Sequence, residues 1–148
     1  MEEQIQLHKE FREKQEKYSY YIIALCITSI GFSVLRTSGQ PLKFIQIPLA
    51  LAVISWGLSV LSGFTFIGKI TSSIYRNSMY LDILQGRDPD VGNDQKSIEI
   101  AIKLYRETNP EFSKKASFYA KSQQRLFYIG IVLFILWHVL EMAHAVSR

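Results

Sequence analysis

The chain has 148 residues, a formal net charge of +4 at neutral pH and 48% apolar residues. This length favours one domain, and the single cysteine, Cys26, excludes an internal disulfide. Charged residues are absent from 18–35, 44–68 and 126–140. Because about 20 helical residues cross a bilayer core of about 30 Å, the sequence predicts a helical membrane protein. A soluble bundle with three buried helices is the alternative.

The first predicted helix begins near residue 3 and carries a span at about 18–36. No Gly or Pro occurs before the span, and apolar residues recur there at roughly helical spacing: Ile5, Phe11, Tyr18 and Ile22. A charged disordered segment before the span is the alternative. Arg36 closes the apolar run where a cleaved signal peptide would carry small residues, so we expect an uncleaved spanning helix.

The second predicted span covers about 44–67 and is apolar on all its faces, unlike a surface helix. The sequence carries no stop signal at Lys69, and Gly86 is the first suitable C-cap residue. We therefore expect this helix to continue well beyond its span. The stretch "GRDPDVGND", with its two Gly, one Pro and three Asp residues, then breaks the chain.

The rest of the chain is predicted to form a short helix followed by a long one. Asn93 or Asp94 caps the short helix, which ends near Glu107. The motif "TNPE" restarts the chain, because Pro110 suits the first position of a helix. The third span, at about 125–145, is then the far half of this last helix.

The predicted architecture is one helical membrane domain over residues 1–148. It is an all-α, polytopic membrane protein with three transmembrane helices and long cytoplasmic helical extensions. Region 69–124 is the expected cytoplasmic helical region, and the water-side halves of the helices are expected to form a bundle, because such extensions are marginal in water without partners.

The distribution of Lys and Arg predicts the orientation. Fourteen of these residues precede the first span or lie between the second and third, and three lie on the other side. The positive-inside rule therefore predicts a cytoplasmic amino terminus and an outside carboxyl terminus. The expected location is the inner membrane of a bacterium.

Ionisable residues occur at the end of the third span: His138, Glu141 and His144. Residues three apart lie on one side of a helix, and ionisable groups within a span suggest ion passage, a proton relay or metal binding. If the span starts near Gln123, Glu141 instead lies at the outer headgroup boundary. A pore-lining ring in an oligomer is the second interpretation, and a metal site is not expected.

Small residues on the first two spans are candidates for close helix packing. On the second span Ser55, Ser59 and Gly63 are four apart and Ala52 flanks them; on the first, Ala24 and Thr28 are four apart. Small residues at this spacing let helix backbones approach closely. For Ser55 and Ser59, a hydroxyl-lined channel wall is the alternative.

A basic run precedes the third span: Lys114, Lys115, Lys121 and Arg125. No acid lies between Glu111 and Glu141, so we expect contact with anionic lipid headgroups rather than nucleic acid. The acidic loop matches a calcium-binding loop poorly, because its fifth and sixth positions are Gly92 and Asn93. A solvated turn with a helix cap is expected there.

Two stretches carry a resemblance: "EFREKQEKYSYYIIALCITSIGFSVL" and "FIQIPLALAVISWGLSVLSGF". With a charged cytoplasmic helix followed by a transmembrane hairpin, residues 10–85 resemble small bacterial membrane effectors that accompany antiviral defence systems. The resemblance implies oligomerisation on a signal, followed by membrane leakage. The third span departs from the two-helix version of that plan, and no functional residue carries over.

The leading hypothesis is a small homo-oligomer that conducts ions or perturbs the membrane, with the cytoplasmic helices used for assembly or sensing. The alternative is a non-conducting membrane anchor or accessory subunit that docks a soluble cytoplasmic partner. The sequence carries no glycine-rich phosphate loop, nucleophile elbow or Cys-x-x-Cys pair. Enzyme activity and a cofactor are therefore not expected.

Overall fold

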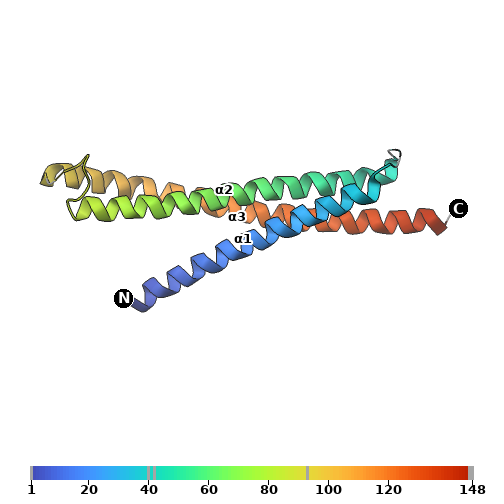
Figure 1. Cartoon of the computed structure of the whole chain (residues 1–148), viewed down its shortest axis with the longest axis horizontal. Helices are drawn as coiled ribbons and strands as arrows, with labels where there is room; N and C mark the ends of the chain where they lie inside the picture. The colour runs from blue at the N-terminus through green and yellow to red at the C-terminus, as the bar shows by residue number, and fades with distance from the viewer. Residues whose placement is uncertain (1, 40, 42, 93, 147–148) are drawn as a thin grey trace. The chain divides into compact units, whose positions relative to one another are not determined.

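The computed structural model describes residues 2–39, 41, 43–92 and 94–146, and over this part of the chain it is helical apart from its loops and contains no strand. The helical elements follow one another as α1 (Glu2–Thr37), the short 3-10 helix η1 (Phe44–Gln46), α2 (Ile47–Leu84) and α3 (Gln95–Val146) (Figure 1). The predicted all-α class is confirmed.

Each long helix contains a segment that is long and apolar enough to cross a membrane: Glu10–Thr37, Phe44–Leu84 and Lys114–Ala145. These segments include the predicted spans at 18–36, 44–67 and 125–145. Since a bilayer core takes about 20 helical residues, α2 with 38 residues and α3 with 52 are both longer than one crossing needs. The prediction that the helices extend beyond the predicted spans is confirmed.

The end of α2 has the geometry that its sequence predicts. Gly86 adopts a left-handed conformation with φ of 63°. Its N–H donates to the carbonyl of Ile83 at 3.1 Å, and the N–H of Arg87 donates to the carbonyl of Asp82 at 2.9 Å. This pair of bonds is a Schellman motif, which satisfies carbonyls left open by the helix end.

Two aspartates shape the loop between α2 and α3. Oδ1 of Asp88 accepts from the N–H groups of Asp90 at 3.0 Å and Val91 at 3.1 Å, so this carboxylate closes a turn. Oδ2 of Asp94 accepts from the N–H of Ser97 at 3.1 Å, which makes Asp94 the N-cap of α3. The predicted turn and cap are confirmed for Asp94; Asn93, the other cap candidate, lies outside the described residues.

The predicted break at "TNPE" is wrong, because α3 continues through Pro110. Proline lacks an N–H and costs about 3 kcal/mol inside a helix, so the rest of the helix must offset this cost. Contacts with α2 occur on both sides of the proline. Tyr105 stacks on Tyr80, and Lys69 lies over the ring of Tyr119. Packing against one continuous partner helix thus favours a single helix.

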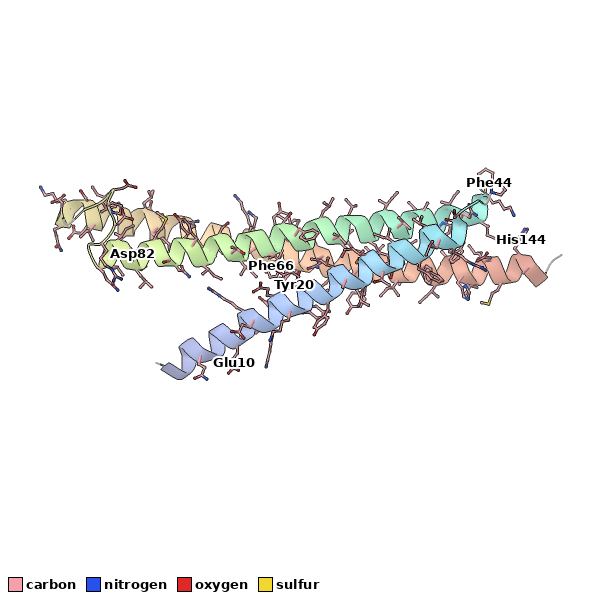
Figure 2. All side chains as sticks on the ribbon, viewed as in Figure 1. Glu10, Tyr20, Phe44, Phe66, Asp82 and His144 are labelled. Atoms are coloured by element: carbon pink, nitrogen blue, oxygen red, sulfur yellow. The ribbon has the colours of Figure 1, made fainter. Side chains whose placement is uncertain are left out.

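The chain divides into two compact units. The three-helix unit comprises Met1–Phe64 and Ala120–Arg148, and the hairpin unit comprises Thr65–Tyr119. In the three-helix unit α1 and α3 run in the same direction and α2 runs opposite to both (Figure 1). Phe44 and His144 lie at the same end of this unit (Figure 2). Its core consists of Ile22, Cys26, Ala52 and Trp56.

The hairpin unit is made by α2 and α3 alone. The rings of Tyr80 and Tyr105 stack with centroids 4.4 Å apart, and the Tyr105 hydroxyl donates a hydrogen bond to Oδ1 of Asn77. The structure differs here from the expected bundle, because α1 is not part of this unit. Near the amino end of α1, Leu7 and Phe11 lie four residues apart and are both exposed.

Candidate functional site

The most distinctive group in the three-helix unit is the side chain of Gln123 on α3, which is only 2% exposed. Its Oε1 accepts a 2.7 Å hydrogen bond from the hydroxyl of Ser19 on α1. Its Nε2 donates to the main-chain carbonyl of Ser19 at 3.1 Å. The amide therefore binds both the side chain and the backbone of one residue, which fixes α1 against α3.

Two serines of α2 complete the connection on the other side of α3. Ser59 donates a 2.8 Å hydrogen bond to the main-chain carbonyl of Gln123, and Ser55 donates a 2.8 Å bond to that of Leu126. Residues four apart lie on one helix face, so both hydroxyls point at α3. We call Ser19, Ser55, Ser59 and Gln123 the polar cluster.

Gly63 makes room for the polar cluster. A Cβ atom at this position would come within 2.9 Å of Cδ of Gln123 and of Cδ1 of Ile23, and would approach Nε2 of Gln123 still more closely. A side chain at Gly63 would therefore displace groups that connect the three helices. The packing role expected from the small-residue spacing is consistent with this position, and Ala52, fully buried, lies in the apolar core.

The polar cluster acts on helix packing rather than on chemistry. It contains no ionisable side chain, and its hydroxyl donors and its amide are already hydrogen-bonded. In an apolar surrounding an interhelical hydrogen bond is worth about 0.6 kcal/mol on average and up to about 1.7 kcal/mol. Several such bonds at one level give the packing a defined register.

The pair of small residues predicted to pack on the first span, Ala24 and Thr28, points outward. Ala24 and Thr28 are exposed, and the hydroxyl of Thr28 donates to the carbonyl of Ala24 at 2.9 Å within α1. They do not contribute to packing within the described part of the chain. Contact between these residues and a second copy stays a prediction.

The ionisable residues at the end of α3 lie apart from the polar cluster. His138 and His144 are exposed and Glu141 is half-buried, whereas Ser55 and Ser59 contact α3 at residues 123 and 126. The five candidate pore residues therefore do not form one site within a chain. Among the described residues, no group of three His, Cys, Asp or Glu side chains is placed to hold a metal ion.

The four basic residues expected to contact lipid are all exposed. Lys114 and Lys115 belong to the hairpin unit, whereas Lys121 and Arg125 belong to the three-helix unit. In the latter unit they are on the turns that flank Gln123, but their side chains face outward while that of Gln123 faces the other helices.

The hairpin unit carries large apolar side chains that are exposed. They are Ile74, Tyr75, Met79, Leu81, Leu84, Ile100, Leu104 and Phe118. Ile100 is 69% exposed and Leu104 is 62% exposed, and these residues are one helical turn apart. Isolated exposed apolar residues are common, but residues stacked on successive turns form a candidate contact surface.

Sequence reasoning missed Ser19 and Gln123. Each stands next to the start of an apolar segment, where a polar residue is usually interpreted as facing the headgroups. A signal was nevertheless present, since Gln123 lies seven residues, about two helical turns, before Gly130, the only glycine of this predicted span. Both residues face α2.

Comparisons of the chain with protein-family models, with curated proteins and with solved structures found no match.

Proposed function

We propose that the protein is a three-span integral membrane protein that anchors a soluble protein partner through its hairpin unit. The observation that carries the proposal is that the hairpin unit has large exposed apolar residues outside the predicted spans at 18–36, 44–67 and 125–145. The polar groups of the three-helix unit, by comparison, bond to one another inside it.

The inward direction of the polar cluster favours an anchor. A conducting path needs polar groups on a surface that water or ions reach. Ser55 and Ser59 instead donate to backbone carbonyls of α3 and are buried. A single chain of this kind gives lipid an apolar outer surface, and the hydroxyls of Ser55 and Ser59 are satisfied inside it, as polar groups within a span require.

The exposed apolar residues of the hairpin unit favour a protein partner. Ile100 and Leu104 on α3 lie one turn apart and are flanked by exposed charged residues, Lys96, Glu99, Lys103 and Glu107. An apolar centre with a polar rim is typical of protein interfaces. The matching partner is a soluble protein with an apolar ridge, of the kind that an amphipathic helix presents.

The orientation in this proposal follows from charge. Arg36 is in the last turn of α1 and Lys43 directly precedes Phe44, so both lie beside the loop between α1 and α2. Phe44 and His144 lie at the same end of the three-helix unit (Figure 2). Most basic residues lie toward the other end or in the hairpin unit, so the positive-inside rule puts the hairpin unit and the amino terminus in the cytoplasm. Arg148, which the same rule counts outside, lies beyond the described residues.

Site-specific photo-cross-linking in native membranes tests the proposal. A photoreactive amino acid at Leu104 is expected to give one adduct with a soluble protein, because Leu104 lies in the exposed apolar surface. The same probe at Gln85, which is exposed in the turn after α2, is the control and is expected to give none. Adducts at Leu104 that contain only a second copy of the chain would contradict the anchor.

A conducting homo-oligomer is the second candidate. It is favoured by the exposure of His138, His144 and Thr28, which leaves these side chains accessible to a second copy of the chain. It is also what the resemblance to membrane effectors implies. Ion flux through proteoliposomes tests it: flux that falls in a Glu141→Gln variant supports a pore mouth, and a verified oligomer without flux contradicts it.

A further inference from the structure

One exposed face of α3 changes in chemistry along the helix. Lys121, Arg125 and Tyr128 are spaced four and three apart and are all exposed, so they lie on the same face. The face continues through Val132, 65% exposed, and Ile135, 56% exposed. It is therefore cationic, then aromatic, then aliphatic over a few turns, which is the order of headgroup, interface and hydrocarbon in a bilayer.

A residue of α1 joins this face at its aromatic level. The side chain of Tyr18 lies close to that of Tyr128. The two side chains remain accessible, since Tyr18 is 43% exposed and Tyr128 is 56% exposed. Along α3, Tyr128 follows Arg125 by about one helical turn. Both residues belong to the three-helix unit.

We propose that Lys121, Arg125, Tyr128 and Tyr18 form a binding site for the phosphate of an anionic phospholipid. A guanidinium presents paired N–H donors that match two phosphate oxygens, and an ammonium adds a compact positive charge. The tyrosine hydroxyls supply neutral donors at the same level. The tyrosine rings and the aliphatic face below them lie alongside the start of the acyl chains.

Charge complementarity selects this occupant. The sequence of α3 contains no acid between Glu111 and Glu141, and no ion pair of Lys121 or Arg125 occurs among the described residues. The preceding turns of α1 carry charges of both signs in Lys14, Lys17, Glu13 and Glu16, of which Glu16 is half-buried. The positive charge of the site therefore comes from α3.

The site rests on the proposed membrane insertion but not on the proposed soluble partner. The position of the site along α3 also agrees with that of the polar cluster, because Lys121 and Arg125 flank Gln123 in sequence. Polar contacts inside the unit and cations outside it then share one level, at the headgroups. This arrangement would fix the depth at which α3 enters the hydrocarbon.

Native mass spectrometry of the purified full-length protein in detergent tests the site, with phosphatidylglycerol and phosphatidylcholine titrated separately. The wild-type protein is expected to bind phosphatidylglycerol more tightly. The Lys121→Gln/Arg125→Gln variant is expected to lose this preference by roughly five-fold for each cation removed. A Lys96→Gln/Lys103→Gln variant removes the same charge from exposed positions on the same helix and is expected to keep the preference.

A Tyr18→Phe/Tyr128→Phe variant distinguishes a specific lipid-binding site from general electrostatic attraction between the cations and anionic lipid. It retains every charge and both rings, so a drop of roughly two- to five-fold in phosphatidylglycerol affinity is expected from lost hydrogen bonds. Unchanged affinity in this variant, or an equal loss in the control variant, would overturn the site. Failure of the wild-type protein to float with vesicles would instead overturn membrane insertion, whereas a floating protein without headgroup preference overturns the lipid site alone.

Discussion

Gly130 of α3 lies directly against the indole ring of Trp56 on α2. A Cβ atom added at Gly130 would come within 2.9 Å of Cε2 of that ring. Trp56 is only 2% exposed, and its Nε1 has no hydrogen-bond partner among the described residues. The contact therefore depends on shape, and it permits a large ring to fit between two helices in the core of the three-helix unit.

A Gly130→Ala substitution is expected to destabilise the three-helix unit. The indole is a rigid group that also packs against Phe134, with ring centroids 5.7 Å apart, so the helices must separate to admit a methyl group. Overpacking of this kind costs about 1–3 kcal/mol. Unfolding of the purified protein in detergent, followed by tryptophan fluorescence, measures the change.

The matched control for this substitution is Gly57→Ala. A Cβ atom at Gly57 meets no atom within 4 Å, so this variant should unfold like the wild-type protein or be slightly more stable, because alanine favours helix. Equal destabilisation by both substitutions would show that the loss of glycine itself, rather than the contact with Trp56, is responsible.

A Gln123→Leu substitution tests the polar cluster. It removes both hydrogen bonds to Ser19 and leaves that hydroxyl without its partner on α3. The expected loss is about 1–2 kcal/mol in the free energy of unfolding. Gln124→Leu, at the exposed neighbouring position, is expected to have little effect.

A double-mutant cycle with Ser19→Ala identifies the source of that loss. If the two residues act through their mutual bonds, the effects of Ser19→Ala and Gln123→Leu should be less than additive. Additive effects would mean that Gln123 contributes through its volume or through contacts with Gly63 instead.

Tyr105 and Leu104 are adjacent in sequence but have different predicted roles. Tyr105 stacks on Tyr80 and donates to Asn77, so Tyr105→Ala is expected to destabilise the hairpin unit by about 2 kcal/mol. Leu104 is exposed, so Leu104→Ala should preserve the fold and reduce cross-linking to the proposed partner. Hydrogen exchange across residues 95–119 measures the stability of the hairpin unit in both variants. Loss of protection in the Leu104→Ala variant as well as in the Tyr105→Ala variant would contradict these different roles.

The N-cap of α3 predicts a specific pH dependence. Hydrogen bonds from the side chain and the backbone N–H of Ser97 hold the pKa of the Asp94 carboxyl below its ordinary value. Because the folded-state pKa is the lower one, the cap contributes stability above the unfolded pKa, about 3.9, and loses it as the pH falls through the folded-state value.

Hydrogen-exchange protection factors at Ser97 and Ile98, followed as the pH is lowered, should therefore decrease in the wild-type protein. An Asp94→Asn variant retains a capping side chain but has no carboxyl to titrate, so its protection factors should not change over the same range. A parallel decrease in the variant would assign the effect to another group.

Local signals predicted much of the fold, and contacts between distant residues account for what was missed. The uninterrupted helix before Arg36, the C-cap at Gly86 and the N-cap at Asp94 each depend on residues within a turn of one another. The burial of Gln123 depends on Ser19, which is 104 positions away. The continuity of α3 through Pro110 likewise depends on packing against α2, which the motif "TNPE" does not reveal.

The candidate site, like the fold, could be predicted only in part from the spacing of its residues. The spacing of Ser55, Ser59 and Gly63 predicted close packing, and these residues do face α3. The spacing does not specify which helix they meet or that their hydroxyls are satisfied by backbone carbonyls. For His138, Glu141 and His144 the single chain gives positions only, and their function stays a prediction.

Cysteine accessibility in intact cells tests the central claim, three membrane crossings with the hairpin unit in the cytoplasm, most directly. In a Cys26→Ala background, single substitutions are made at two exposed loop positions: Ser38→Cys between α1 and α2, and Gln85→Cys after α2. A membrane-impermeant maleimide is expected to label the Ser38→Cys variant in intact cells and the Gln85→Cys variant only after permeabilisation. Labelling of both variants in intact cells, or of neither after permeabilisation of a folded protein, would contradict the account.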